Sequence, residues 1–411
     1  MNKHNNIAKI GILLIASLAF TQIHAQRRLI IEVKQDLNAL SLSADSYQNA
    51  LNKLKPALTN DETKDDAYTW YLAGKISFSK FDKYRNMKVI GKSVDDKAMC
   101  SILLEGYDYM QTALKLDTII EKDKNGNVKI NKSTGQPKFK TKYSKEIHKI
   151  ILSHHNDYKN MGRSLYTSSQ NLSQAYKAWD IYTSMPDNPS YPRLRETTSD
   201  SIIGEYRFYQ GIVAKMDENY NNALSSFYKA IAKGYTKKDV FDYAISCAEH
   251  EKNDTVLVDI VRQAYTLYGK KDSQYIGILI NYAIKHKKYD IATKIIDQAI
   301  SDNPENAEYY DLKGVLLENQ NGSIDASYEY FKKAVELDSD FIKANFDLGR
   351  YYYNMALRES ETQQLKELLD KARPYLEKVY NSEPNNKAAK DALRNIYYNF
   401  NEADKMEALG E

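Results

Sequence analysis

Residues 273–306 read SQYIGILINYAIKHKKYDIATKIIDQAISDNPEN, and this stretch decides the fold class. Its apolar and small residues recur three or four positions apart in two runs, as on one face of each of two helices: Ile276, Leu279, Ile280, Ala283, Ala292, Ile296 and Ala299. Pro304 follows, where the second helix is expected to have ended. One such pair of helices cannot bury both apolar faces alone, so the stretch predicts a stack of similar helical hairpins.

The same register extends over residues 204–386. Small residues return where two helix axes would cross closely, at Gly211, Gly314 and Gly349. After Gly349, the next matching residue, Ala372, arrives 11 positions late, which is about three helical turns. The late match therefore predicts one lengthened hairpin at this point of a regular array.

Residues 26–185 show the same pattern less regularly and predict further hairpins with two insertions. The first insertion, residues 81–96, is expected as an excursion between two helices. The second, near residues 118–143, is expected as a hairpin-like loop, because Asn125 and Gly126 form a turn signal between short alternating segments. Residues 186–203 contain three prolines and predict a flexible connector, and residues 387–411 predict a capping helix.

The first 25 residues have the organisation of a secretory signal peptide. Lys3, His4 and Lys9 precede an apolar run, Ile10 to Phe20, and Ala25 stands at the expected cleavage position. The run is about half of the roughly 20 residues that a transmembrane helix needs. We therefore expect export and cleavage after Ala25, with no transmembrane segment in the mature chain.

The formal net charge of +3 is too small to indicate a nucleic-acid partner. The charge is unevenly distributed, however, because residues 301–411 carry 14 basic and 22 acidic side chains, a local net of −8. This asymmetry is compatible with ordinary variation on solvated faces and also with a basic partner near the C-terminal end.

With these small and apolar positions, the chain resembles exported tetratricopeptide-repeat (TPR) proteins of the Gram-negative bacterial envelope. The resemblance is clearest over residues 204–386, and Lys313 departs from it, since an apolar residue is usual there. It implies an all-α fold, a right-handed α-solenoid of stacked TPR-like hairpins. It also implies a non-enzymatic scaffold without cofactors, which binds envelope proteins or peptides through its concave surface, in the periplasm or on the periplasmic face of the outer membrane.

In such repeats the concave wall is lined by positions 2, 5, 9, 12 and 13 of the first helix of each hairpin. In the C-terminal hairpins these positions nominate a partner-binding groove made of Asn281, Lys285, Asp311, Val315, Glu318, Phe346, Arg350, Tyr353 and Asn354. Large amphipathic side chains of this kind suit peptide recognition. A merely solvated inner face is the alternative.

A second class of function, glycan binding, rests on the 34 tyrosines. Most of them are expected to pack at helix crossings while their hydroxyls reach water. An exposed remainder could stack on sugar rings, as in glycan-binding proteins of the starch-uptake type. Proteins of that type resemble lipoproteins with a cysteine after the signal peptide, and none is present here.

An enzymatic or metal-binding interpretation would begin at His148, His154, His155 and Asp157. No two of these histidines are three or four positions apart, the spacing that chelates zinc on a helix. Phosphate-binding glycine loops and the Gly-x-Ser-x-Gly motif are also absent from the sequence. We therefore expect histidines at surfaces or helix interfaces, no metal site and no catalysis.

Three short triplets resemble acceptor sites for O-glycosylation in some Gram-negative bacteria. Each has an Asp, then a hydroxyl residue, then an aliphatic residue, and the acceptors would be Thr118, Ser201 and Thr255. Patterns of three residues are common by chance, and intact-mass measurement of the native protein tests them.

Overall fold

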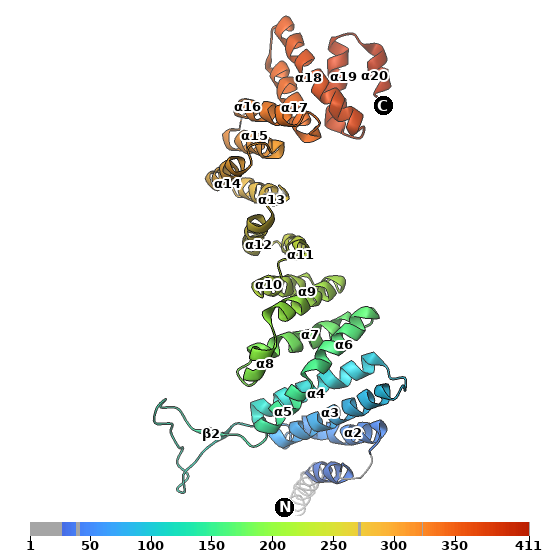
Figure 1. Ribbon diagram of the computed structural model, residues 1–411, viewed down its shortest axis with the longest axis vertical. Helices are drawn as coiled ribbons and strands as arrows, with labels where there is room; N and C mark the ends of the chain where they lie inside the picture. Colours follow the sequence, from blue (N-terminus) through green and yellow to red (C-terminus); the bar gives the residue numbers. More distant parts are fainter. Residues whose placement is uncertain (1–26, 38–41, 270–272, 323, 411) are drawn as a thin grey trace, which may run out of the picture. The chain divides into compact units, whose positions relative to one another are not determined.

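The computed structural model describes residues 27–37, 42–269, 273–322 and 324–410 (Figure 1). The predicted signal peptide lies outside these residues. The chain forms two compact units, of which the first ends at Thr236 and the second begins at Lys237. Both are built from helical hairpins, which confirms the all-α solenoid class; the right-handed sense of the array stays a prediction.

In the first unit, residues 27–36 are helical and precede a series of antiparallel helices with one small sheet. The elements are α2 (Ala44–Thr59), α3 (Ala67–Val89), α4 (Asp96–Leu116), β1 (Ile119–Ile120), β2 (Phe139–Lys140), α5 (Ser144–Ser153), α6 (His155–Thr167), α7 (Leu172–Ser184), the 3-10 helix η1 (Met185–Asp187), α8 (Pro192–Thr197), α9 (Asp200–Met216) and α10 (Tyr220–Ala232).

The second unit continues with regular hairpins and ends in a pair of helices. Its elements are α11 (Lys238–His250), α12 (Asp254–Tyr268), α13 (Gln274–Lys285), α14 (Tyr289–Asp302), α15 (Ala307–Asn321), the 3-10 helix η2 (Ile324–Ser327), α16 (Tyr328–Leu337), α17 (Ile342–Arg358), α18 (Thr362–Ser382), α19 (Lys387–Asn399) and α20 (Ala403–Ala408).

In five of the hairpins, a glycine of the first helix packs against a large residue of the second helix. A Cβ atom added to Gly162 would lie 2.5 Å from the Trp179 ring, and one added to Gly74 would lie 2.8 Å from Met110. Gly211, Gly314 and Gly349 meet Phe227, Phe331 and Leu376 in the same way. Because close helix crossing leaves no room for a side chain, these glycines set the distance between the paired helices.

The turns inside the hairpins also repeat. Asn219 and Asn253 cap α10 and α12 with nearly identical backbone angles, φ −91° and ψ 75°, and each accepts a hydrogen bond from the backbone N–H three residues later. The preceding residue is left-handed in both turns, with φ 56° at Glu218 and 53° at Lys252. The side-chain cap satisfies an N–H group that the first helical turn leaves free.

Two hairpins are longer than the others. The lengthening predicted after Gly349 is confirmed, since α17 and α18 have 17 and 21 residues. The excursion predicted over residues 81–96 is wrong: α3 continues to Val89 with Phe81 buried, and α4 begins at Asp96. The extra residues extend two helices that pack on each other. Phe81, Met99 and Cys100 are buried there, whereas Val89 and Ile90 at the end of α3 are exposed.

The connector and the cap differ from the prediction as well. Residues 186–203 contain the end of η1, helix α8 and the start of α9, and Tyr191 between them is 3% exposed in the core of the first unit. This segment is therefore packed on the helices and is not an open linker. The capping segment contains two helices, α19 and α20, and Leu409 behind them is buried.

Lys313, the departure from the repeat pattern, is 5% exposed in α15. Its ammonium group lies 2.7 Å from the Asp297 carboxylate of α14 and 5.9 Å from the centre of the Tyr330 ring. The methylene stem occupies the place of the usual apolar residue while the charge reaches a partner at the surface.

Candidate functional site

In the second unit, α13, α15 and α17 are the first helices of three consecutive hairpins, and α15 contacts both of the others. Between them lies a groove of about 910 Å3. Its lining alternates apolar, amide and charged side chains: Gly277, Asn281, Glu308, Leu312, Val315, Glu318, Asn319, Gly322, Ile324, Lys343, Phe346, Asp347, Arg350, Asn354 and Arg358. This set is called the inner groove below.

Six of the nine predicted partner-binding residues line the inner groove. Asn281 comes from α13, Val315 and Glu318 from α15, and Phe346, Arg350 and Asn354 from α17. The spacing rule finds them because inner-wall positions of stacked first helices point to one side of the array. Whether they bind a partner stays a prediction.

The structure separates the other three predicted residues from the groove. Asp311 is fully buried behind its wall. The Tyr353 hydroxyl accepts a hydrogen bond of 2.9 Å from the Asn395 amide of α19, so this ring faces the cap. Lys285 lines a smaller hollow of about 320 Å3 and lies 3.6 Å from Asp254.

Arg350 and Glu318, which were both predicted to contact a partner, form an ion pair with each other. Two guanidinium nitrogens of Arg350 donate to the two carboxylate oxygens of Glu318 at 2.7 and 2.6 Å, and the Asp347 carboxylate is 3.0 Å away. The hydrogen bond to Glu318 raises the pKa of Arg350 although burial opposes it. A paired, partly buried guanidinium of this kind joins α15 to α17 and keeps the groove wall in one geometry.

Asp311 places a second charge cluster behind the same wall. Its Oδ2 atom accepts a hydrogen bond from the Lys343 ammonium group, and its Oδ1 atom is buried without a donor among the described residues. Burial raises the pKa of Asp311 to about 7; Lys343 opposes this shift and the neighbouring Asp347 carboxylate adds to it. The charge behind the groove wall therefore changes near neutral pH.

His148, His154 and His155 lie at helix interfaces, which is one of the two placements that the sequence predicted. His148 shares a hydrogen bond of 3.0 Å with the Tyr191 hydroxyl, and His155 Nε2 donates to the Tyr182 carbonyl at 3.0 Å. The Nε2 atom of His154 lies 3.2 Å from the Asp82 carboxylate, which belongs to α3. Among the described residues, no three His, Cys, Asp or Glu side chains are grouped as metal ligands.

A hollow that the sequence analysis missed lies in the first unit, among α6, α7 and α9. Its volume is about 420 Å3, and it is rich in aromatic rings: its lining is Arg163, Tyr166, Thr167, Trp179, Glu205, Tyr206 and Tyr209. The rings form a connected cluster, with Trp179 centred 5.8 Å from Tyr166 and 5.9 Å from Tyr206. The inner-wall rule applied to these hairpins would have found Arg163, Tyr166, Thr167 and Glu205.

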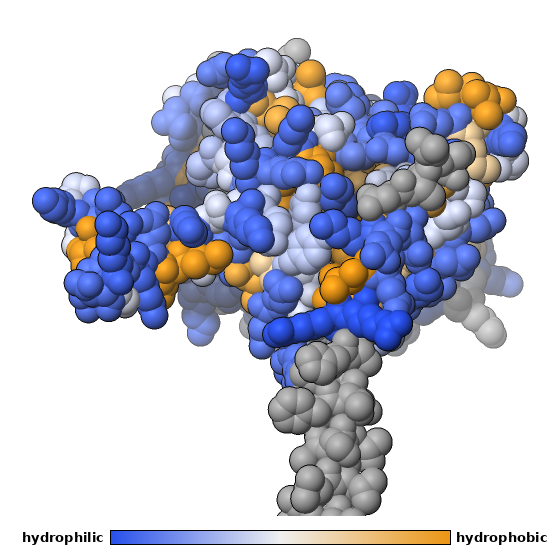
Figure 2. All heavy atoms as spheres, turned by 90° about the horizontal axis from the view of Figure 1, so that it is seen from below, coloured by the Kyte–Doolittle hydropathy of each residue, from blue (hydrophilic) through white to orange (hydrophobic). Residues whose placement is uncertain are grey.

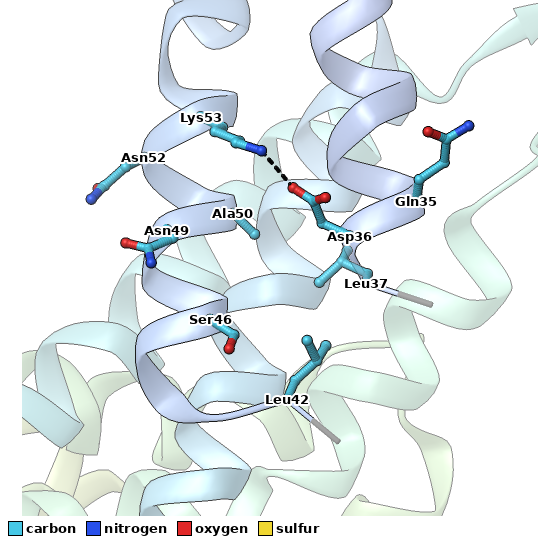
Figure 3. A pocket seen from close by; sticks show the side chains of 9 residues that line it. All are labelled: Gln35, Asp36, Leu37, Leu42, Ser46, Asn49, Ala50, Asn52 and Lys53. Carbon is cyan, nitrogen blue, oxygen red and sulfur yellow. Dashed lines mark hydrogen bonds and ion pairs between the residues drawn. The ribbon is translucent and has the colours of Figure 1, made fainter. Parts of the chain in front are cut away.

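Figure 3 shows a further hollow, of about 1080 Å3, between residues 27–37 and α2. The Lys53 ammonium group and the Asp36 carboxylate approach to 2.7 Å beside it. Leu37 and Leu42, which also line it, flank residues 38–41, which lie outside the described part of the chain. For this reason we assign no function to this hollow.

The three predicted glycosylation acceptors are exposed. Thr118 follows α4, and Ser201 and Thr255 lie in the first turns of α9 and α12. Their exposure permits modification, which stays a prediction. Separately, none of the helices in the described ranges combines the length and apolar character needed to cross a membrane.

No protein-family model and no curated protein sequence matches this chain. Solved structures of TPR proteins resemble parts of it. The C-terminal part of a TPR repeat-containing protein from Cytophaga hutchinsonii is 12% identical, with 61% of this chain and 94% of that chain covered and a TM-score of 0.40. PilF of Pseudomonas aeruginosa is 15% identical, with coverage of 50% and 88% and a TM-score of 0.38. YrrB, a TPR protein with an unusual peptide-binding site, is 17% identical, with coverage of 50% and 98% and a TM-score of 0.33. These similarities are weak, and the hairpin packing stands without them.

Proposed function

We propose that this protein is a non-enzymatic scaffold that binds a peptide segment of another protein in the inner groove. The observation that carries the proposal is the composition of the groove. Leu312, Val315 and Phe346 supply apolar surface, and amides from α13, α15 and α17 stand beside it. Apolar surface with a few oriented polar groups is the usual lining of a peptide site.

The paired charges support the same function. Because Arg350 and Glu318 already neutralise each other, the groove does not select a strongly charged ligand through them. Asn281, Asn319 and Asn354 have amide groups that both donate and accept, as the backbone of an extended peptide does. The proposed ligand is therefore a peptide with at least one apolar side chain. The groove would recognise it largely through hydrogen bonds to its backbone.

The location in the proposal comes from the sequence alone. The N-terminal pattern supports export with cleavage after Ala25, and hence a partner in the periplasm or at the periplasmic face of the outer membrane. N-terminal sequencing of the protein isolated from cells tests this part. A mature chain that begins at Gln26 is expected, and retention of residues 1–25 would contradict it.

Site-specific photo-crosslinking tests the groove. A photoreactive amino acid at Asn354 lies in the inner groove, whereas one at Lys332 of α16 is exposed outside it. We expect a crosslinked protein from envelope fractions at position 354 and none at position 332. Equal crosslinking at both positions would count against a specific groove.

A groove-filling variant provides the second arm. Asn281→Arg adds a long side chain at an exposed groove position without removing a buried contact. It should abolish the crosslink at position 354, while Glu336→Arg on α16, which is 52% exposed, should preserve it. Unchanged crosslinking in the Asn281 variant, with helical content intact by circular dichroism, would remove the groove assignment.

Glycan binding remains the alternative, and the aromatic hollow of the first unit is the observation that favours it. Tyr206 and Tyr209 could stack on a sugar ring beside the polar groups of Arg163 and Glu205. Binding to a glycan array that is lost in Tyr209→Ala, without any partner crosslinked at position 354, would favour this alternative.

A further inference from the structure

Residues 118–143, called the arm below, leave the first unit between α4 and α5 as a small ribbon (Figure 1). Ile119 pairs with Lys140 and Ile120 with Phe139 in β1 and β2. Beyond this ladder, two isolated bridges join the middle segment to the other two, Lys122 with Val128 and Ile130 with Pro137. The arm therefore contains three short extended segments, as the Asn-Gly signal led us to expect for a hairpin-like loop.

The pairing assigns the side chains of the arm to two faces. Residues directly opposite each other share a face, and so do residues two positions apart in one strand. Applied in turn to these pairs, the rule places six residues on one face: Ile120, Lys122, Val128, Ile130, Pro137 and Phe139. One face thus collects five apolar residues and a single lysine, and the other carries Lys129, Lys138 and Lys140 together with Ile119 and Glu121.

The apolar face is uncovered. Ile120 is 45% exposed, Val128 41%, Ile130 49% and Phe139 52%. Figure 2 shows hydrophobic residues gathered on the projecting ribbon, at the left of the view, among hydrophilic ones. Large apolar side chains grouped on one exposed face usually mark an interaction surface.

The arm is also strongly basic. It has seven lysines and only two acidic residues, a net charge of +5, whereas the whole chain has a net charge of +3. All seven lysines are exposed, and the one ion pair between lysine and carboxylate within the arm, Lys129 with Glu121, is long at 3.4 Å. The arm therefore complements a surface with dispersed negative charge.

The base of the arm is held firmly. The Asp117 carboxylate accepts backbone hydrogen bonds from Lys142, Tyr143 and Ser144 at 2.7–3.0 Å, and a further one from the Ser144 hydroxyl at 2.8 Å. Burial alone would raise the pKa of Asp117, but these hydrogen bonds lower it below its usual value. The arm is thus fixed at its root and presents its apolar face without support from a helix.

We propose that the arm binds the surface of a bilayer that contains anionic lipids. Its apolar face enters the interfacial region, and its lysines lie at the level of the lipid phosphates, as in amphipathic membrane-surface helices. Its net charge of +5 complements a surface of dispersed negative charge, which an anionic bilayer presents. Capture of a protein in place of lipid is an outcome of the test below. This proposal is independent of the inner groove.

Vesicle binding tests the proposal with the full chain lacking only the signal peptide. We expect co-sedimentation with phosphatidylcholine vesicles that contain phosphatidylglycerol, and at least about tenfold weaker binding to phosphatidylcholine alone or in high salt. The double variant Ile130→Asp with Phe139→Asp should bind at least about tenfold less well to the anionic vesicles. Leu357→Asp, which changes an exposed apolar residue of α17, should bind like the wild type.

A probe on each face checks the geometry. Cys100 and Cys247 are buried, so an environment-sensitive dye can be attached selectively to Val128→Cys or Lys129→Cys. Anionic vesicles should increase the fluorescence at position 128 much more than at position 129. Equal responses, no vesicle binding by the wild type, or arm-dependent capture of a protein in place of lipid would each overturn the proposal.

Discussion

Gly314 lies against Phe331 of α16, whose ring would be 2.4 Å from an added Cβ atom. Gly277 in α13 is also helical, but nothing lies within 4 Å of the position of its missing Cβ. The same residue type therefore has a packing role at one position and none at the other.

These two glycines give a matched test. Gly314→Ala should destabilise the protein by up to about 2 kcal/mol, because an overpacking cost of about 1–3 kcal/mol exceeds the gain in helix propensity of about 1 kcal/mol. Gly277→Ala should stabilise it by up to about 1 kcal/mol. Denaturant unfolding measures both, and a change of the same sign in the two variants would contradict the packing role of Gly314.

Asp311 predicts a pH dependence of stability. Its folded pKa, about 7, is above the value of about 3.9 in an unfolded chain, so the folded state binds more protons between these limits. The contribution of Asp311 to the free energy of unfolding must then fall as pH rises through this range, by at most about 1.4 kcal/mol per pH unit.

The variant Asp311→Asn isolates this contribution. From about pH 5 to about pH 7, the wild type should lose stability relative to the variant, whereas Asp391→Asn, an exposed control in α19, should follow the wild type. Unfolding free energies at several pH values provide the measurement. Parallel profiles of wild type and Asp311→Asn would show that this carboxyl group does not titrate there.

At the scale of elements, inserted residues form two different structures in this chain: a lengthened helical hairpin and the arm. The insertion between Gly74 and Gly106 extends α3 and α4 and buries Phe81 and Leu103. In the insertion after Asp117, none of residues 118–142 is buried. The packing of α3 on α4 explains the first outcome, and alternation with a turn signal explains the second.

Removal of the arm should therefore leave the fold intact. Replacing residues 119–140 by a short Gly-Ser linker removes no buried residue and keeps Asp117 and its partners Lys142 to Ser144. A shorter loop also costs slightly less entropy, so the free energy of unfolding should be unchanged or higher by about 0.5 kcal/mol. Thermal and denaturant unfolding measure it, and a loss of cooperativity would mean that the arm supports the helices.

At the scale of the whole molecule, each repeat array needs ends that do not expose its core. In the second unit, α19 places Leu393 and Ile396 in one buried cluster with Leu376 and Val379 of α18. The opposite side of α19 carries Tyr398, which is 71% exposed. The pair α19 and α20 thus closes the C-terminal end of the second unit.

Truncation after Asn386 should expose this cluster. We expect a lower unfolding midpoint and concentration-dependent self-association, because the truncation removes large buried side chains, among them Leu393, Ile396 and Leu409, each of which contributes about 1.5–3 kcal/mol. Light scattering coupled to size-exclusion chromatography detects the association. Tyr398→Ala is the control and should stay within about 0.5 kcal/mol of the wild type; a truncated chain that remains as stable and soluble as the intact protein would refute the capping role.

The sequence by itself determined the helical hairpins, the glycine positions between their helices, the lengthened α17–α18 pair and the turn in the arm. These features depend on residues close together in one hairpin, where helical spacing or alternation is directly visible. It also located six residues of the inner groove, since inner-wall positions recur in every repeat.

Only the tertiary structure decided how those residues are used. Arg350 is held by Glu318, Asp311 is buried beside Asp347, and Tyr353 faces Asn395, and in each case the partner belongs to another helix or another turn. The continuation of α3 to Val89 and the single apolar face of the arm likewise depend on which segments pack or pair. The periodicity of the sequence indicates which side of a helix or strand is apolar. The residues that this side contacts are distant in the sequence, so the periodicity does not identify them.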